Sequence, residues 1–226
     1  MAVLFARQSG TQGDLDAAHK AEAAGDLPRA ESIYRNLLAA HPDPEIYQRL
    51  GLVRHLQNNF AAAATAFERA IHLNPRLWTS HLFLGMDYYR TNRFTDALTH
   101  LEIADRLHPG QSETRFWRGA TLLALRRYLP AFETLESLLQ SDPNNLETLK
   151  LLSESYADYG TRLLNEVGEK YPATAAGLEV LGRAFEFEGS YDSALRAYRQ
   201  SAAKDPHRTG IQEAIARILP HIAPTQ

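Results

Sequence analysis

The 226-residue chain contains no cysteine. This absence excludes disulfide bonds, thiolate zinc sites, iron–sulfur clusters and a cysteine nucleophile. An excess of positive charge is also missing, because 24 Lys and Arg stand against 27 Asp and Glu, for a formal net charge of −3. A nucleic-acid partner is therefore not expected, since binding to a phosphate backbone relies on lysine and arginine.

Long hydrophobic runs are absent too. No stretch approaches the roughly 18 uninterrupted apolar residues of a membrane-spanning helix, so membrane insertion is not expected. The apolar start Ala2–Ala6 lacks the basic residues and the length of a secretory signal. Two interpretations stay open: a frayed terminus of a cytoplasmic protein, which is the default, or a remnant, Met1 to Ala6, of the export signal of a periplasmic or secreted protein.

Several kinds of residue recur in phase with a period near 34. The prolines are separated by 33, 34, 34, 29 and 34 residues, and series of alanine, glycine and aromatic residues keep the same intervals. The prolines are Pro42, Pro75, Pro109, Pro143, Pro172 and Pro206, the alanines Ala30, Ala63, Ala97, Ala131 and Ala194, and the glycines Gly51, Gly85, Gly119 and Gly182. Such periodicity predicts a stack of about six similar structural units.

Each unit has the pattern of a helix, a turn and a second helix. Apolar residues recur every three or four positions in two runs per unit, which is helical periodicity. Between the runs stand residues that accept the left-handed conformation found at helix ends, namely Gly25, Asn58, Asn92 and Gly189. A glycine inside a helix costs about 1 kcal/mol relative to alanine. The phased glycines therefore predict that another helix crosses close by.

The stretch Leu50-Gly51, Phe60, Ala63, Phe67, Ala70 and Asn74-Pro75 resembles the unit of the tetratricopeptide repeat (TPR) family. The resemblance covers about Leu15 to Pro206. It implies an all-α, right-handed superhelical solenoid of about six helix-turn-helix units with a C-terminal capping helix. The expected boundaries are a flexible lead at 1–13, units at 14–42, 44–75, 76–109, 110–143, 144–172 and 173–206, a capping helix at 207–219 and a loose tail at 220–226.

The fifth unit is shorter than the others. Five residues are missing between Tyr156 and Leu164, where the turn between the two helices belongs. Tyr159-Gly160 must therefore form a very tight turn, or the chain must continue as one long kinked helix. We expect the superhelix to change direction here; the alternative is a harmless deletion in a surface loop.

No constellation for catalysis is present. The sequence contains no Gly-rich phosphate loop, no His-Glu-x-x-His pair and no G-x-S-x-G turn. Its nine histidines show no ligand spacing together with a third oxygen or nitrogen donor. Neither an enzymatic activity, nor a cofactor, nor a metal site is expected.

The concave surface of such a solenoid is lined by the first helices, and surfaces of this kind hold peptide segments. The repeat register predicts groove side chains that are apolar and aromatic in the middle units and charged in the later ones. They are Leu52, His55, Leu82, Phe83, Met86, Tyr89, Phe116, Trp117, Leu123, Lys150 and Arg183. An exposed apolar strip of this size indicates a covering partner. A register shifted by one residue would instead turn Phe83, Phe116 and Trp117 into ordinary core.

The resulting hypothesis is a non-catalytic scaffold or adaptor. Its partner would be another protein or a peptide segment with an apolar part and a basic or mixed-charge part. Two alternatives remain: a structural homo-oligomer that uses the same strip for self-association, and an accessory repeat subunit of an enzyme assembly. Some TPR proteins hold a C-terminal carboxylate with a cluster of Lys, Arg and Asn, but Leu82, Phe83 and Trp117 occupy the corresponding places here.

Overall fold

The computed structural model describes residues 2–170 and 174–222, and their side chains except those of 2–11, 164–165 and 167–169. All regular structure in this part of the chain is helical. The chain divides into two compact units, Met1–Leu149 and Lys150–Gln226.

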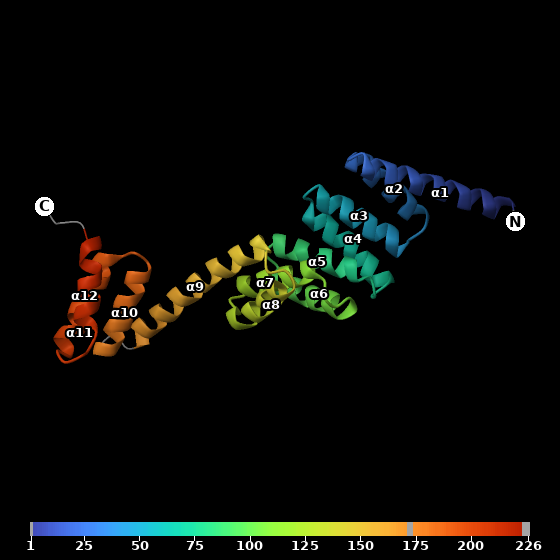
Figure 1. Cartoon of the computed structure of the whole chain (residues 1–226). Helices are drawn as coiled ribbons and strands as arrows, with labels where there is room; N and C mark the ends of the chain where they lie inside the picture. Colours follow the sequence, from blue (N-terminus) through green and yellow to red (C-terminus); the bar gives the residue numbers. More distant parts are fainter. Residues whose placement is uncertain (1, 171–173, 223–226) are drawn as a thin grey trace. The chain divides into compact units, whose positions relative to one another are not determined.

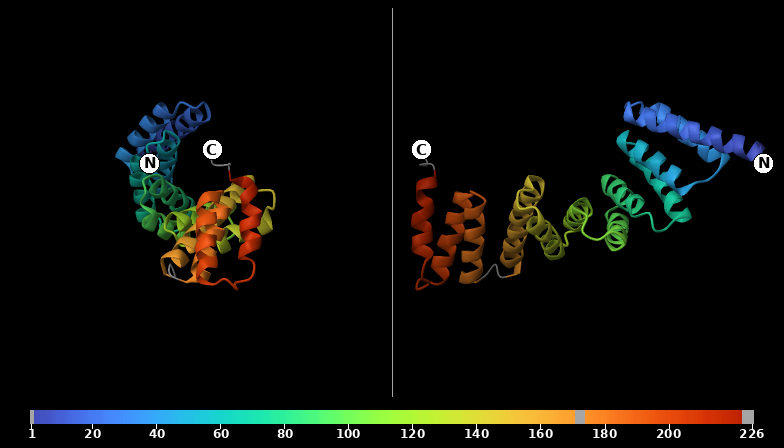
Figure 2. Two further views of the ribbon diagram at one scale, coloured as in Figure 1. Left: turned by 90° about the vertical axis from the view of Figure 1, so that its left-hand side faces the viewer. Right: turned by 45° about the vertical axis from the view of Figure 1, so that its right-hand side comes forward.

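The first unit consists of eight helices and the start of a ninth (Figure 1). They are α1 (Ala2–Ala23), α2 (Leu27–Ala40), α3 (Pro44–Leu56), α4 (Phe60–Leu73), α5 (Trp78–Arg90), α6 (Phe94–Leu107), α7 (Ser112–Ala124), α8 (Tyr128–Ser141) and the beginning of α9 (Leu146–Lys170). From α1 to α8, each helix packs against the next, and the first helices α3, α5 and α7 also contact one another in series. The unit is therefore a stack of helix pairs, as the views of Figure 2 show.

The turns inside the helix pairs adopt the expected left-handed backbone. Gly25, Asn58 and Asn92 have φ values of 75°, 58° and 60°. The fourth pair uses Arg126, with φ 56°, at the equivalent place. Sequence patterns did not point to this residue, because arginine seldom adopts the left-handed region.

The phased glycines lie where the two helices of a pair approach most closely. A Cβ atom built on Gly51, Gly85 or Gly119 would lie 2.6, 2.6 and 2.5 Å from the side chains of Phe67, Leu101 and Leu135, respectively. In the second unit, Gly182 has the same relation to Tyr198, at 2.6 Å. The predicted close crossing is confirmed in four helix pairs.

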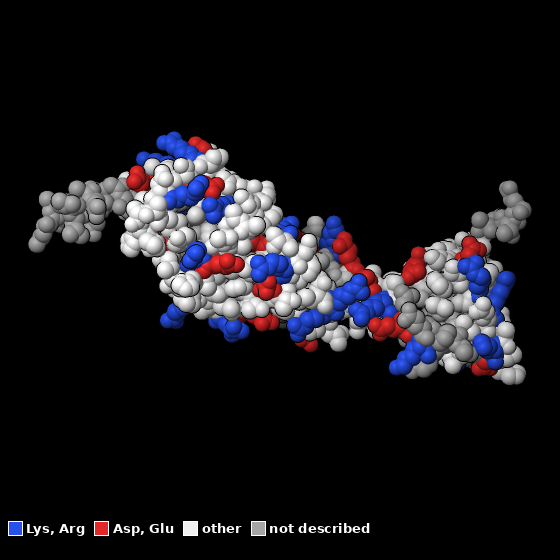
Figure 3. Space-filling model, turned by 180° about the vertical axis from the view of Figure 1, so that it is seen from behind, with Lys and Arg blue, Asp and Glu red and all other residues white. Residues whose placement is uncertain are grey.

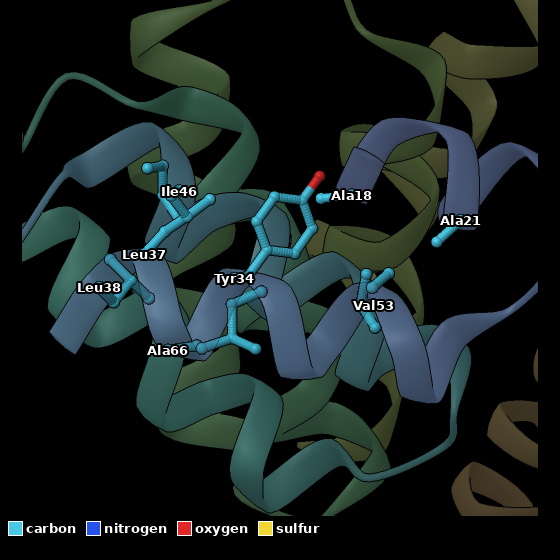
Figure 4. Close-up of a cluster of buried hydrophobic side chains, with 10 residues drawn as sticks. Ala18, Ala21, Tyr34, Leu37, Leu38, Ile46, Val53 and Ala66 are labelled. Atoms are coloured by element: carbon cyan, nitrogen blue, oxygen red, sulfur yellow. The ribbon is translucent and has the colours of Figure 1, made fainter. Parts of the chain in front are cut away.

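The core of the first unit begins under α1. Tyr34 is fully buried at the centre of a cluster from α1, α2, α3 and α4 (Figure 4). Ala18 and Ala21 bring α1 into this cluster, at 0% and 5% exposed. The expected flexible lead at 1–13 differs from the structure, since α1 begins at Ala2. The second half of α1 is anchored in the core, and the helix extends from it into the first half, because extending a formed helix costs much less free energy than nucleating one.

The shortened fifth unit is spanned by one helix. Helix α9 runs without interruption from Leu146 to Lys170, through Tyr159-Gly160, and so joins the first unit to the second. The chain follows the single-helix alternative, and the missing turn is not a surface loop. The expected change of direction of the superhelix stays a prediction.

The second unit continues with α10 (Ala175–Phe187), α11 (Tyr191–Lys204), α12 (Ile211–Ile218) and a short 3₁₀ helix at Leu219–His221. Ile211, Ala214 and Ile218 of α12 pack against Ala194 and Tyr198 of α11. Helix α12 thus covers the last helix pair, as a capping helix does. Of the expected loose tail, residues 223–226 lie outside the described part of the chain.

We expect replacement by alanine to have opposite effects on the free energy of unfolding at two helical glycines. In Gly85→Ala, the new Cβ would lie 2.6 Å from Leu101 and 3.2 Å from the backbone oxygen of Ala97, so the free energy of unfolding should fall by about 1–2 kcal/mol. In Gly160→Ala of α9 the Cβ meets nothing within 4 Å, so the matched control should gain up to about 1 kcal/mol. Urea denaturation measures both. A Gly85→Ala variant at least as stable as the wild type would refute the close crossing.

Candidate functional site

An aromatic cluster connects α5 and α7 in the first unit. Tyr89 and Trp117 meet edge to face at 5.3 Å between ring centroids, and Phe116 meets Trp117 at 5.8 Å. The guanidinium of Arg90 lies over the indole of Trp117, 5.2 Å from the ring centroid. All three aromatic side chains are half-buried. These contacts join the side chains of two neighbouring first helices into one half-buried aromatic cluster.

Next to this cluster is an open cavity of about 290 Å³, which we call the α7 cavity. Its lining residues come from α5, α7, α8 and the start of α9: Met86, Ser112, Glu113, Phe116, Trp117, Leu138, Asn145 and Glu147. Met86 and Leu138 are 7% and 1% exposed, whereas both glutamates are exposed. The cavity therefore combines apolar walls with two accessible carboxylates.

Local structure fixes the polar side of the α7 cavity. The side-chain oxygen of Asn145 accepts a hydrogen bond from the backbone N–H of Thr148 at 2.9 Å. This contact caps the start of α9 and places Glu147 in its first turn. Glu113 likewise lies in the first turn of α7. A carboxylate at a helix N-terminus is favoured by the helix dipole, so both positions suit the charge.

Three of the predicted groove residues, Met86, Phe116 and Trp117, line the α7 cavity. The other lining residues were not predicted, and most of them come from α8 and the start of α9, which only tertiary packing brings to the site. One signal was present in the sequence. Glu113 and Glu147 are separated by 34 residues, so they hold the same repeat position.

Of the other predicted groove residues, Leu82 belongs to the core, which corrects its assignment, while three more pack against core clusters and stay half-buried. Leu82 is only 2% exposed and packs with Leu101 and Ala104. Phe83 stacks on Phe67 at 5.9 Å between ring centroids, and Leu52 packs against the same cluster. Leu123 packs with Leu98, Leu122 and Ala131. Phe83, Leu52 and Leu123 are half-buried, as Phe116 and Trp117 are, so their place in the groove stays a prediction.

His55 takes part in a buried polar contact. Its Nδ1 lies 2.6 Å from Oδ1 of Asp87, which is 0% exposed. The ring also meets Phe60 and Phe83 edge to face. Burial raises the pKa of Asp87, and the hydrogen bond to His55 opposes that rise. His55 is thus positioned as a link between α3 and α5.

The two charged predictions, Lys150 and Arg183, belong to the second unit. Lys150 is exposed, with its Nζ 4.0 Å from Glu154. Arg183 donates to Glu179 at 2.7 Å, and Glu179 also accepts a hydrogen bond from Arg208. These charges are neutralised by neighbours within the unit. A groove that passes from apolar to charged stays a prediction.

A histidine pair in α5 and α6 was not anticipated. Nδ1 of His81 lies 3.0 Å from Nδ1 of His100, and Nε2 of His81 is 3.2 Å from the backbone oxygen of Pro75. Burial lowers the pKa of both histidines, that of His100 to about 4. Both rings are therefore neutral at pH 7. Among the described residues, no group of three or more His, Asp or Glu could hold a metal ion.

Charged side chains of both signs are interspersed on the face of the molecule in Figure 3. Within the described residues, no helix combines the length and the apolar character needed to span a bilayer.

The family model described as tetratricopeptide repeat matches residues 15–77 and 84–145. These ranges include α7, the part of α5 from residue 84 onward, and every lining residue of the α7 cavity except Glu147. No curated protein sequence matches the chain.

Solved structures share the fold at low sequence identity. A tetratricopeptide repeat protein from Parabacteroides merdae has a TM-score of 0.59 at 13% identity, covering 93% of this chain and 99% of its own. MamA has a TM-score of 0.55 at 16% identity, covering 84% and 94%. YrrB, a TPR protein with an unusual peptide-binding site, has a TM-score of 0.52 at 16% identity, covering 80% and 96%. At these identities the likeness concerns the fold alone.

We expect the histidine pair to make the protein sensitive to mild acid. The folded-state pKa of His100, about 4, lies below the ordinary 6.5, so the unfolded chain binds protons more readily between these values. The free energy of unfolding should therefore fall as the pH drops from 6.5 towards 4. In His100→Gln the fall from pH 7 to pH 5 should shrink by about 1 kcal/mol, after allowance for solvent screening.

Denaturant titrations at several pH values test this expectation. His72→Gln, which removes an exposed histidine from α4, should keep the wild-type pH dependence. Equal pH dependence of the free energy of unfolding in the wild type and His100→Gln would show that His100 is not the source of the acid sensitivity.

The contact between His55 and Asp87 should give a large coupling energy between the two side chains in the free energy of unfolding. His55→Leu leaves a buried carboxyl group without a hydrogen-bond partner, which should lower the free energy of unfolding by about 1–3 kcal/mol. Adding Asp87→Leu removes the group left unpaired and should recover part of that loss. A double-mutant cycle measured by urea denaturation gives the coupling. Strictly additive losses would show that the two side chains do not interact.

Proposed function

This chain belongs to the tetratricopeptide repeat family, and we propose that its first unit binds a segment of a partner protein along α5 and α7. Proteins of this fold generally act as scaffolds for protein–protein interaction. In this role the chain is non-catalytic and serves as an adaptor. The apolar and aromatic side chains of Met86, Phe116 and Trp117 form the contact surface.

The observation that carries the proposal is the α7 cavity beside the aromatic cluster. Its walls are built from buried Met86 and Leu138 and half-buried Phe116 and Trp117, so it can bury an apolar side chain without rearranging the core. Large aromatic residues around a preformed cavity are the usual anchors of protein interfaces. YrrB, a protein with the same fold, has a peptide-binding site, which supports a peptide-binding role for this chain.

Loss of the Trp117 side chain should weaken binding without unfolding the protein. The indole is half-buried and lines the cavity, so Trp117→Ala should cost about 2 kcal/mol of binding, or roughly 30-fold in Kd. Trp78→Ala is the matched control, because Trp78 lies on α5 against His108 and does not line the cavity. Partners captured by the wild-type chain are identified, purified and titrated against all three proteins by calorimetry.

A partner that binds the wild type and Trp117→Ala equally well would refute the role of the α7 cavity. Light scattering over a concentration series addresses the self-association alternative. We expect a constant mass for the wild type. A mass that rises with concentration, and that Trp117→Ala holds constant, would assign the same surface to a homo-oligomer instead.

A further inference from the structure

We propose that the partner segment carries a lysine or arginine close to a large apolar side chain. The apolar side chain enters the α7 cavity, and the cation binds the carboxylates of Glu113 and Glu147. This inference rests on the proposed function and adds to it the chemistry of the partner.

The two glutamates are free to take a cation. Both are exposed, and among the described residues neither has a hydrogen-bond or ion-pair partner. Some carboxylates of the first unit are engaged within the protein: Asp105 accepts from Arg118 at 2.6 Å, and Glu31 accepts from Arg54 at 2.9 Å. Unlike these two, the glutamates of the cavity present carboxylates that no described side chain pairs with.

The lining of the α7 cavity has a charge of one sign. Of its eight residues, two are glutamates and none is lysine or arginine. Arg90 lies outside this lining, over the indole of Trp117. A segment with acidic residues, or one ending in a carboxylate held at this place, would be repelled, because like charges at an interface cost binding energy. Charge complementarity therefore selects a basic segment.

The apolar walls of the cavity determine which side chain of the partner segment can enter it. Met86, Phe116, Trp117 and Leu138 enclose a cavity of about 290 Å³, which accommodates one large side chain. The exposed carboxylates belong to the same cavity. The lysine or arginine of the partner segment must therefore lie close in sequence to the apolar residue that enters the cavity.

Selection from a random library of 12-residue peptides displayed on phage tests the inference on the full-length chain. Peptides are selected on the wild type after depletion on Trp117→Ala, so that those retained depend on the α7 cavity. We expect them to carry Lys or Arg within two positions of Leu, Ile, Phe or Trp. One such peptide, labelled with fluorescein, then reports Kd by anisotropy.

Removal of the two negative charges should weaken the binding of this peptide. In Glu113→Gln/Glu147→Gln we expect Kd to rise about tenfold, and raising the salt concentration should weaken binding to the wild type but not to this variant. Both substitutions also remove a charge from the first turn of a helix. The matched control is Asp192→Asn/Glu213→Gln, which does the same in α11 and α12, and its Kd should equal that of the wild type.

The outcomes separate this inference from the proposed function. Peptides that depend on Trp117 but show no enrichment of Lys or Arg, or that bind the glutamine variant equally well, would overturn the inference and leave the proposed function standing. A selection that yields no peptide dependent on Trp117 would overturn both.

Discussion

The close approach of the two helices in each pair is the constraint on which the architecture depends. At Gly51, Gly85, Gly119 and Gly182 the first helix has no side chain, and a large side chain of the second helix occupies that space. This fit fixes how the helices of a pair cross, and therefore where the opposite face of each first helix points. The surface formed by α5 and α7 is a result of these contacts, because the same glycines that let one face of each first helix pack against its second helix leave the opposite face outside the pair.

Much of the fold could be predicted because these contacts repeat. Series of glycine, alanine and proline in phase specify the helix pairs, and the left-handed turns at Asn58 and Asn92 follow from residues that tolerate them. Two features of the fold could not be predicted from the repeat pattern. Arg126 adopts a conformation that its side chain disfavours, and α1 extends to Ala2 because its second half is anchored in the core. Both depend on tertiary context, which a local pattern does not contain.

The candidate site could be predicted only in part. Position on a first helix singled out Phe116 and Trp117, which line the α7 cavity, but the same reasoning assigned Leu82 to the groove although it is buried in the core. Neighbouring residues on a helix differ by about 100° in direction, so periodicity alone cannot decide between core and surface near the boundary of an apolar face. Most of the remaining cavity residues come from other helices or from the residue before α9. Their arrangement around Trp117 is a property of packing between repeats.

Contacts between successive first helices make the repeats unequal. Gln48 accepts a hydrogen bond from Ser80 at 2.9 Å, and His55 meets Asp87 at 2.6 Å, each pair being 32 residues apart. Ser80 and Asp87 are fully buried, so each needs the polar side chain that α3 supplies. A helix pair moved to another place in the stack would leave such groups facing apolar neighbours. The order of the units is therefore encoded in their matched polar side chains, and this chain cannot be lengthened or shuffled as if its repeats were interchangeable modules.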